Sequence, residues 1–328
     1  MSTVLVTGGA GFIGSHVCEA LLRRGDSVVA LDNFNDFYDP KIKRSNVHAI
    51  RKTTEEQRGS FALEEGDIRD NGFLAEAFDR HEIDAVIHLA AYAGVRPSIE
   101  NPQLYTEVNV LGTTNLLEMM KTQGIKRHVF ASSSSVYGNN RKIPFSEKDP
   151  VDKAISPYAA TKKAGEVICY TYHHLYGINT ACLRFFTVYG PRQRPDLAIH
   201  KFTKLILAGQ PIPFYGDGSM KRDFTYIDDI VDGVLKALDW TNATDSRYKI
   251  FNLGNSTPMA LSELVKAIEE VVGKNAIIKR LPQPPGDVDC TYADITQAKE
   301  ILGYCPKFDT ASGLKNFYVW LTSTQTGK

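Results

Sequence analysis

A tyrosine and a lysine one helical turn apart carry the clearest chemical signal in this sequence. In the stretch SPYAATK, Ser156 can cap a helix and Pro157 suits its first turn. Tyr158 and Lys162 then lie at positions i and i+4 on one helical face. A free tyrosine titrates near pH ~10, and a nearby ammonium favours the phenolate. Tyr158 is therefore predicted to be a general base, although such a pair alone also occurs on surface helices.

A run of four serines supplies hydroxyl groups at the end of a predicted strand. The stretch FASSSSVYG covers residues 130–138. In open α/β sheets, ligands bind at the carboxyl ends of the strands. A hydroxyl of this run that lies near Tyr158 can share or relay the proton of a substrate hydroxyl. The alternative is a polar strand end that leads into a turn.

A glycine-rich turn upstream indicates what lies beside these residues. The stretch TGGAGFIG at 7–14 follows a predicted strand and opens a helix. Gly8 suits the tight turn, Gly11 permits close approach of a pyrophosphate, and Gly14 permits close packing of the helix. The helix N-terminus offers unpaired N–H groups to phosphates. The glycine pattern alone is equally compatible with a purely structural turn. The surrounding sequence therefore has to decide whether it binds a dinucleotide.

An aspartate at the end of the second strand supports a dinucleotide. Asp32 lies 18 residues after Gly14, where a carboxylate can accept hydrogen bonds from both ribose hydroxyls and repel a 2′-phosphate. This favours NAD over NADP, and a helix-capping aspartate is the alternative. Asp67 is predicted beside the adenine, or in a simple turn. The other residues predicted at this site are Phe12, Ile13, Asn33, Ile68, Leu89, Ala90 and Ala91.

The elements that position these residues alternate between short apolar runs and helical patterns. Predicted strands at 4–6, 28–31, 85–89 and 128–132 are separated by helices, the first at 15–24. Such alternation predicts α/β architecture, a doubly wound parallel sheet. We expect a Rossmann-like NAD-binding domain at 1–184. A smaller mixed α/β domain at 185–328 is expected to bind substrate, and the segment at about 224–254 is expected to return to the first domain.

Composition excludes several classes of protein. Lys plus Arg and Asp plus Glu both total 38, so nothing suggests a nucleic-acid partner. The five cysteines lack metal-ligand spacing, which argues against a zinc site or disulfide framework and fits a reducing compartment. We expect no signal peptide, no apolar span of about 18 residues and a cytoplasmic location. No metal site is expected, and Asp228 and Asp229 are interpreted as a helix N-terminal cap.

Together these stretches resemble the extended short-chain dehydrogenase/reductase superfamily, and within it the nucleotide-sugar epimerase branch. The resemblance covers essentially the whole chain, and the ordered set is far more specific than any one motif. The matching stretches are TGGAGFIG (7–14), Asp32, DI (67–68), HLAA (88–91), SSSSVYG (132–138), YAATK (158–162), RFFTVYGP (184–191), RDFTYIDD (222–229) and GD…YAD (286–294).

The resemblance implies a mechanism in which NAD is held and recycled within each turnover. Tyr158 would remove the proton from the sugar 4-hydroxyl, assisted by Ser133. Hydride would pass from C4 to the nicotinamide, and the 4-keto sugar would turn about its diphosphate and take hydride back on the opposite face. Lys162 would also bond the nicotinamide ribose. Dehydratases and decarboxylases of the superfamily place Glu where this chain has Ser135, which argues against both activities.

UDP-glucuronate is the favoured substrate. Ser133, Ser134 and Ser135 can donate hydrogen bonds to a C6 carboxylate, and such charge-assisted bonds discriminate strongly. Thr187 stands where hexose epimerases of this branch usually carry Asn. Arg194 resembles an arginine that acts near the sugar in glucuronate epimerases.

Further substrate contacts and alternatives also come from the resemblance. Arg96 can act near the sugar as Arg194 does. Arg222 is expected to hold the diphosphate, and Asp287 is expected to lie near the uridine ribose. Glucuronate epimerases often read Trp-Gly where this chain has Arg-Gln at 192–193, and the small Thr291 leaves room for an N-acetylated sugar. UDP-glucose and UDP-N-acetylglucosamine therefore remain alternatives.

Two expectations concern the state of the protein. A non-catalytic NAD-binding descendant is the alternative from another class, and the intact Ser133, Tyr158 and Lys162 argue against it. Family members usually dimerise through two helices per subunit, which implies a homodimer through about 103–121 and 157–176.

Overall fold

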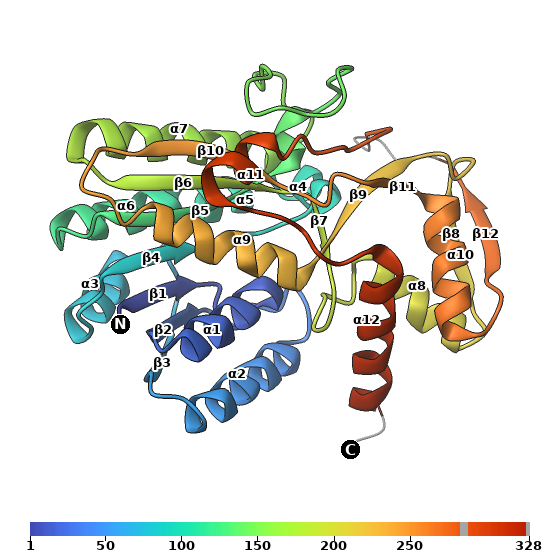
Figure 1. The fold of residues 1–328 in the computed structure, drawn as a ribbon, viewed down its shortest axis with the longest axis horizontal. Coiled ribbons are helices and arrows are strands. Elements are labelled where there is room, and N and C mark those ends of the chain that lie inside the picture. The colour runs from blue at the N-terminus through green and yellow to red at the C-terminus, as the bar shows by residue number, and fades with distance from the viewer. Residues whose placement is uncertain (283–287, 326–328) are drawn as a thin grey trace.

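A seven-stranded parallel sheet forms the centre of the molecule (Figure 1). The computed structural model describes residues 1–282 and 288–325. The predicted doubly wound sheet is confirmed, since the strand order reverses direction at β1 and every neighbouring pair is parallel. The order is β10 (Tyr248–Leu253), β6 (Asn179–Phe185), β5 (Arg127–Ser133), β4 (Ala85–His88), β1 (Thr3–Thr7), β2 (Ser27–Asp32) and β3 (Phe61–Glu65).

Helices cover both faces of this sheet. One face packs against α1 (Phe12–Arg24) and α9 (Ile227–Trp240), with α2 (Pro40–Glu55) beside α1. The other face packs against α3 (Asn71–Arg80), α6 (Gly112–Thr122) and α7 (Pro157–Tyr176). Each face has its own cluster of buried apolar side chains. Strands buried on two faces read as continuous apolar runs, which is why the sequence predicted β1, β2, β4 and β5. The sequence analysis did not predict β6, although every residue of that strand is buried.

Several element boundaries differ from the sequence prediction. The first helix begins at Phe12, directly after the glycine turn, instead of at 15. The helix expected at 103–121 is divided into α5 (Pro102–Thr106), a π-helical turn (Glu107–Leu111) and α6. A π turn adds a residue to one helical turn, which periodicity of the sequence does not reveal. Two short helices, α4 (Val95–Glu100) and a 3₁₀ turn (Ser134–Tyr137), were also not predicted.

The second half of the chain builds two small sheets and further helices beside the central sheet (Figure 1). The chain leaves the central sheet after β6, and β10 rejoins it next to β6. The domain limits themselves stay a prediction. The additional elements are β7 (Thr187–Tyr189), β9 (Lys221–Tyr226) and β11 (Pro258–Ala260) in one sheet, β8 (Pro211–Tyr215) and β12 (Ile277–Leu281) in another, and the helices α8 (Ala198–Leu207), α10 (Leu261–Val272), α11 (Thr296–Leu302) and α12 (Thr310–Gln325).

The acidic pair Asp228 and Asp229 lies in the first turn of α9, at the helix N-terminus as predicted, but without a side-chain capping bond. Tyr226 occupies the N-cap position of α9. Asp229 lies in the first turn and accepts hydrogen bonds from the backbone N–H groups of Lys307, at 2.8 Å, and Phe308, at 3.2 Å. The carboxylate therefore fastens the segment ahead of α12. In the described ranges 1–282 and 288–325, no cluster of His, Cys, Asp or Glu side chains is arranged so that it could hold a metal ion.

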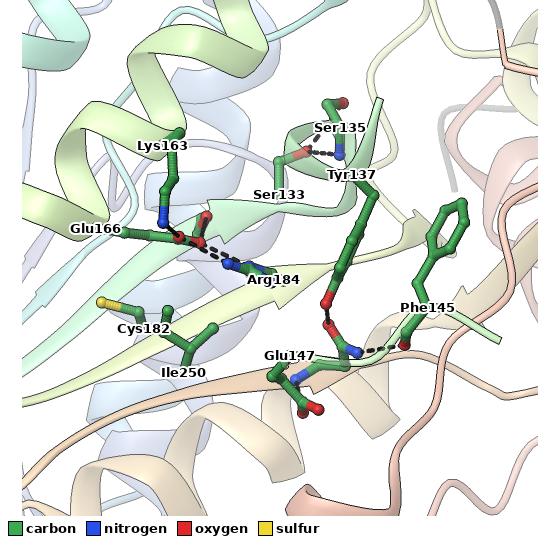
Figure 2. Close-up of polar contacts among 12 residues, drawn as sticks. Ser133, Ser135, Tyr137, Phe145, Glu147, Lys163, Glu166, Cys182, Arg184 and Ile250 are labelled. Atoms are coloured by element: carbon green, nitrogen blue, oxygen red, sulfur yellow. Dashed lines mark hydrogen bonds and ion pairs between the residues drawn. The ribbon is translucent and has the colours of Figure 1, made fainter. Parts of the chain in front are cut away.

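A buried ion pair ties α7 to the strands that carry the predicted site (Figure 2). Glu166 and Arg184 form two hydrogen bonds of 2.8 and 2.9 Å, and both side chains are 1% exposed. Glu166 also accepts a 2.7 Å hydrogen bond from Ser132, the neighbour of Ser133. Arg184 lies 4.8 Å from the centre of the Tyr137 ring. The pair thus fixes α7 against β5 and β6.

Removing one member of this pair should destabilise the protein strongly. Glu166→Gln leaves the buried Arg184 guanidinium without its counter-charge, which costs about 3–5 kcal/mol of unfolding free energy. Urea denaturation followed by circular dichroism measures the loss. Lys163→Met is the matched control, because Lys163 also contacts Glu166 but is 33% exposed. We expect that substitution to cost less than about 1 kcal/mol, and equal losses in the two variants would contradict the account.

Candidate active site

A cavity of about 340 Å³ opens at the carboxyl ends of the parallel strands. It lies where the strand order turns about β1 and β4, the usual ligand position of a doubly wound sheet. The residues predicted for the dinucleotide all line it: Gly8, Gly11, Phe12, Ile13, Gly14, Asp32, Asn33, Asp67, Ile68, Leu89, Ala90 and Ala91. The predicted Ser133, Tyr158, Lys162, Thr187 and Arg194 line the same cavity.

The glycine turn is built by close backbone approach. Gly8 has φ +68°, a conformation that favours glycine. A Cβ at Gly14 would lie 2.1 Å from the carbonyl oxygen of Gly8, so this glycine packs α1 onto the turn itself. Gly11 is the N-cap of α1, and no side chain caps that end of the helix. The first N–H groups of α1 therefore suit a phosphate.

Asp32 lies buried at the end of β2. Its carboxylate accepts hydrogen bonds from the backbone N–H of Phe34 at 2.9 Å and of Ala10 at 3.3 Å. Lys43 of α2 donates a third, at 3.3 Å. Sequence reasoning missed Lys43, because only the tertiary packing of α2 brings position 43 to the cavity. The other lining residues that it missed on the loop after β2 are Asn35, Phe37 and Tyr38.

Asp67 lies in a turn, and its place beside an adenine stays a prediction. It lines the cavity and also closes its own turn, because it accepts hydrogen bonds from the backbone and guanidinium of Arg69 at 2.9–3.0 Å. Asn33 donates to the second carboxylate oxygen at 2.9 Å. Burial opposes the charge, yet these hydrogen bonds lower the pKa of Asp67. The carboxylate is thus ionised and fixed at the cavity wall.

The electrostatics around Tyr158 correct the sequence prediction. Burial raises the pKa of Tyr158, while a hydrogen bond with Ser133 and the charge of Arg194 lower it. Lys162 was expected to tune the tyrosine, but its ammonium donates a 2.7 Å hydrogen bond to the carbonyl oxygen of Ala131. The i, i+4 spacing puts both residues on one face of α7, yet the long lysine side chain reaches β5 instead of the phenol. The charge of Arg194 lowers the pKa of Tyr158, a contribution that the sequence did not predict.

Arg194 is held in place by two neighbours, Asp196 and Phe37. Its guanidinium forms two hydrogen bonds with Asp196, at 2.9 and 3.0 Å, and lies 5.1 Å from the centre of the Phe37 ring.

Tyr105 packs edge-on against Tyr158, with ring centres 6.2 Å apart. The fixed cation and the aromatic wall restrict the position of the phenol.

The serine run forms a turn directly after β5 (Figure 2), and Ser133 hydrogen-bonds to Tyr158. Ser133 accepts a hydrogen bond from the backbone N–H of Ser135 at 3.2 Å and contacts its hydroxyl at 3.1 Å. Ser134 and Ser135 line a second cavity of about 130 Å³, which shares Thr187 with the first. Arg222 also lines this second cavity. The tertiary structure thus places the predicted substrate residues next to the dinucleotide cavity.

One predicted substrate residue, Arg96, lies away from both cavities, and another, Asp287, lies outside the described residues. Arg96 is exposed, and its guanidinium lies 4.8 Å from the centre of the Tyr215 ring with a 3.4 Å hydrogen bond to the phenol oxygen. It does not belong to the wall of either cavity in the described part of the chain, although its neighbour Val95 lines the second.

This chain belongs to the family whose model is described as GDP-mannose 4,6 dehydratase, which matches residues 5–317. The chain is 48% identical over 339 residues to UDP-glucuronate 4-epimerase 5 of Arabidopsis thaliana, with 99% of this chain and 76% of the plant protein covered. It is 44% identical over 321 residues to the UDP-glucuronate 4-epimerase of Thermodesulfobacterium geofontis, with 98% and 96% covered. The predicted relation to nucleotide-sugar epimerases is confirmed.

A solved structure agrees with this assignment. The UDP-glucuronic acid 4-epimerase of Bacillus cereus, in complex with UDP-glucuronic acid and NAD, superimposes with a TM-score of 0.89 at 36% identity. The match covers 98% of this chain and 99% of that one. Within the described ranges, no helix combines the length and the apolar character needed to cross a bilayer.

The buried Lys162 predicts a specific dependence of stability on pH. Burial lowers the pKa of Lys162 to about 8, whereas an unfolded lysine titrates near ~10.4. Between these values the unfolded chain binds the extra proton, so stability rises with pH. Wild type should gain about 3 kcal/mol relative to Lys162→Met between pH 8 and pH 10.4.

Urea denaturation of both proteins, freed of dinucleotide, at several pH values across this window measures that difference. Comparison with Lys162→Met removes the contributions of the other titrating groups. A difference in unfolding free energy that stays constant from pH 8 to pH 10.4 would show that Lys162 titrates normally in the folded protein.

Proposed function

We propose that this protein is an NAD-dependent isomerase that inverts C4 of UDP-glucuronate to give UDP-galacturonate. The observation that carries the proposal is the convergence of Tyr158, Ser133 and Arg194 in the dinucleotide cavity, beside a second cavity that is lined by hydroxyls and Arg222. The relatives named above act on the same sugar nucleotide. Chemistry at C4 needs a base and a hydride carrier side by side, and this edge of the sheet offers room for both.

The cavity suits NAD on structural grounds. The uncapped N-terminus of α1 faces the site of a pyrophosphate, and a Cβ at Gly14 would disrupt the turn that exposes it. Asp32 offers a carboxylate to the ribose diol. Bound NAD would supply the hydride acceptor for C4 and return the hydride to the opposite face of the sugar.

Side chains of the protein carry out the proton transfer at the sugar 4-hydroxyl. Tyr158 takes the proton from the sugar 4-hydroxyl, and Ser133 shares the hydrogen bond at that oxygen. Arg194 stabilises the phenolate through its charge, which offsets part of the cost of burial. Lys162, which donates a hydrogen bond to the carbonyl oxygen of Ala131, is proposed to hold the nicotinamide ribose. The protonated phenol then returns the proton once C4 is inverted.

The acid group of the substrate fits the second cavity. Ser134, Ser135 and Thr187 present hydroxyls that can donate to a C6 carboxylate. Arg222 is proposed to hold the diphosphate about which the keto sugar turns. A carboxylate at position 135, which elimination or decarboxylation in this superfamily uses, is replaced by a serine. Epimerisation is therefore favoured over the dehydratase activity that names the family model.

Neutral and N-acetylated sugars form the second candidate class. Thr291 lines the second cavity, and its hydroxyl accepts a hydrogen bond from the backbone N–H of Asp223 at 3.1 Å. A small residue in that wall leaves room for a C2 substituent. UDP-N-acetylglucosamine and UDP-glucose are therefore the alternative substrates of the same mechanism.

Incubation of the purified protein with UDP-glucuronate, followed by proton NMR, tests the reaction. We expect UDP-galacturonate to appear without added NAD. UDP-glucose and UDP-N-acetylglucosamine are run in parallel, and turnover of either one alone would remove the preference for the acid while keeping the mechanism.

Tyr158→Phe tests the base in the same assay. Loss of the phenol oxygen should lower kcat by about 10²–10⁴-fold while folding and NAD binding stay intact. Tyr170→Phe is the matched control, because Tyr170 lies on the same helix but is half exposed. Near-normal turnover of Tyr158→Phe would refute the assignment of the base.

We further propose a homodimer that works in the cytoplasm. Val167, Tyr170 and Leu175 of α7 expose apolar side chains, as does Leu111 of the π turn ahead of α6. These helices are the two through which members of this superfamily usually dimerise, so a second copy is the proposed occupant. The free cysteines fit a reducing compartment.

Val167→Asp should break this dimer, because it places a charge in the centre of an apolar contact. Analytical ultracentrifugation is expected to show a dimer for wild type and a monomer for the variant. Val319→Asp, at a similarly exposed position on α12, is the control and should stay dimeric. A wild-type monomer at micromolar concentration would contradict the proposal.

A further inference from the structure

A buried lysine stands at the ribose end of the dinucleotide cavity, outside the reaction chemistry. The side chain of Lys43 is 5% exposed, and its ammonium lies 3.3 Å from a carboxylate oxygen of Asp32. The ammonium also lies 5.3 Å from the centre of the Tyr38 ring. Lys43 lines the same cavity as the glycine turn. Burial of an ammonium is costly unless it is paired, so its position calls for an explanation.

The helix that carries Lys43 is fixed to the glycine turn. Asp39 caps α2 by accepting a 2.9 Å hydrogen bond from the backbone N–H of Lys41. Asn46, one turn after Lys43, donates a 2.9 Å hydrogen bond to the carbonyl oxygen of Ala10. Val47 on the same face is buried. The ammonium is thus positioned by α2 and does not sample solvent as a surface lysine does.

The ion pair changes what Asp32 presents to a ligand. A lone carboxylate accepts hydrogen bonds from a ribose diol and repels a 2′-phosphate. Here an ammonium lies beside it, and the pair together carries no net charge. An ammonium donates readily to a hydroxyl oxygen and more strongly to a phosphate. The two residues therefore act in opposite directions on a 2′-phosphate.

We infer that Lys43 is a cofactor-selecting residue: with Asp32 it binds the adenosine ribose as an ion pair, and it is itself a latent ligand for a 2′-phosphate that Asp32 restrains. The inference rests on the proposed use of NAD. Its consequence is that preference for NAD over NADP is set by the balance of two charges. Without the Asp32 carboxylate, the Lys43 ammonium is free to bind the 2′-phosphate of NADP. Without Lys43, the Asp32 carboxylate only repels that phosphate.

A double-mutant cycle tests this balance. Wild type, Asp32→Asn, Lys43→Met and the double variant are freed of bound dinucleotide, and the dissociation constants of NAD and NADP are measured by titration calorimetry. Asp32→Asn should tighten NADP binding about tenfold or more relative to NAD. In that background Lys43→Met should weaken NADP at least about tenfold and NAD far less. In wild type, Lys43→Met should sharpen the preference for NAD.

Controls separate selection from support of the fold. Lys41→Met changes an exposed lysine of the same helix and should leave the ratio of the two dissociation constants unchanged. Lys43→Gln, neutral but still able to bond Asp32, should repeat the result of Lys43→Met and serves if methionine impairs folding. Lys43→Arg keeps the charge and should preserve the NADP affinity gained by Asp32→Asn.

The outcomes distinguish this inference from the proposed function. If Lys43→Met and Lys43→Gln weaken NAD and NADP by the same factor in both backgrounds, Lys43 only supports the fold and the inference is wrong. If wild type binds NAD but Asp32→Asn gains nothing for NADP, the inference also fails while the proposed function stands. A wild-type protein that binds no NAD would overturn both.

Discussion

Parallel alignment of the seven central strands is the constraint on which the site depends. Because all strands run the same way, their carboxyl ends meet at one edge, and Asp32, Ser133 and the glycine turn are brought there from distant parts of the chain. The alignment in turn requires a crossover helix between strands, and α1 and α7 supply the phosphate end and the tyrosine. The parallel alignment of the strands therefore sets both the sheet architecture and the position of these residues at one edge of the sheet.

Two buried ion pairs support the region of the site. Glu166 with Arg184 fixes α7 against the strands, and Lys43 with Asp32 sits at the ribose end of the cavity. The low polarity of the protein interior makes burial of an unpaired charge costly. It also strengthens the electrostatic interaction of a fixed charge with its near neighbours. The phenol of Tyr158 lies in this setting, and its tendency to ionise follows from burial opposed by Ser133 and Arg194. A bound nicotinamide ring would add further positive charge to that balance.

The second cavity, which is proposed to hold the sugar, is lined by residues from both halves of the chain. Ser134 and Ser135 come from the 3₁₀ turn that follows β5, whereas Arg222 and Thr291 come from later in the chain, and all four line one small cavity. The family model bears the name of a dehydratase, yet the relatives with high identity are UDP-glucuronate 4-epimerases. The proposed function attributes part of this difference to Ser135, because a hydroxyl cannot serve as the carboxylate that the elimination is expected to need.

The sequence by itself determined the doubly wound sheet, the glycine turn, Asp32 and the Tyr158 with Lys162 pair, because strand runs and helical spacing are local properties. It did not reveal that Lys162 bonds Ala131, that the charge of Arg194 lowers the pKa of Tyr158, or that Arg96 lies against Tyr215. Nor did it reveal Lys43 beside Asp32. These contacts join residues on different elements, and only tertiary packing sets the distance and direction between long, flexible side chains.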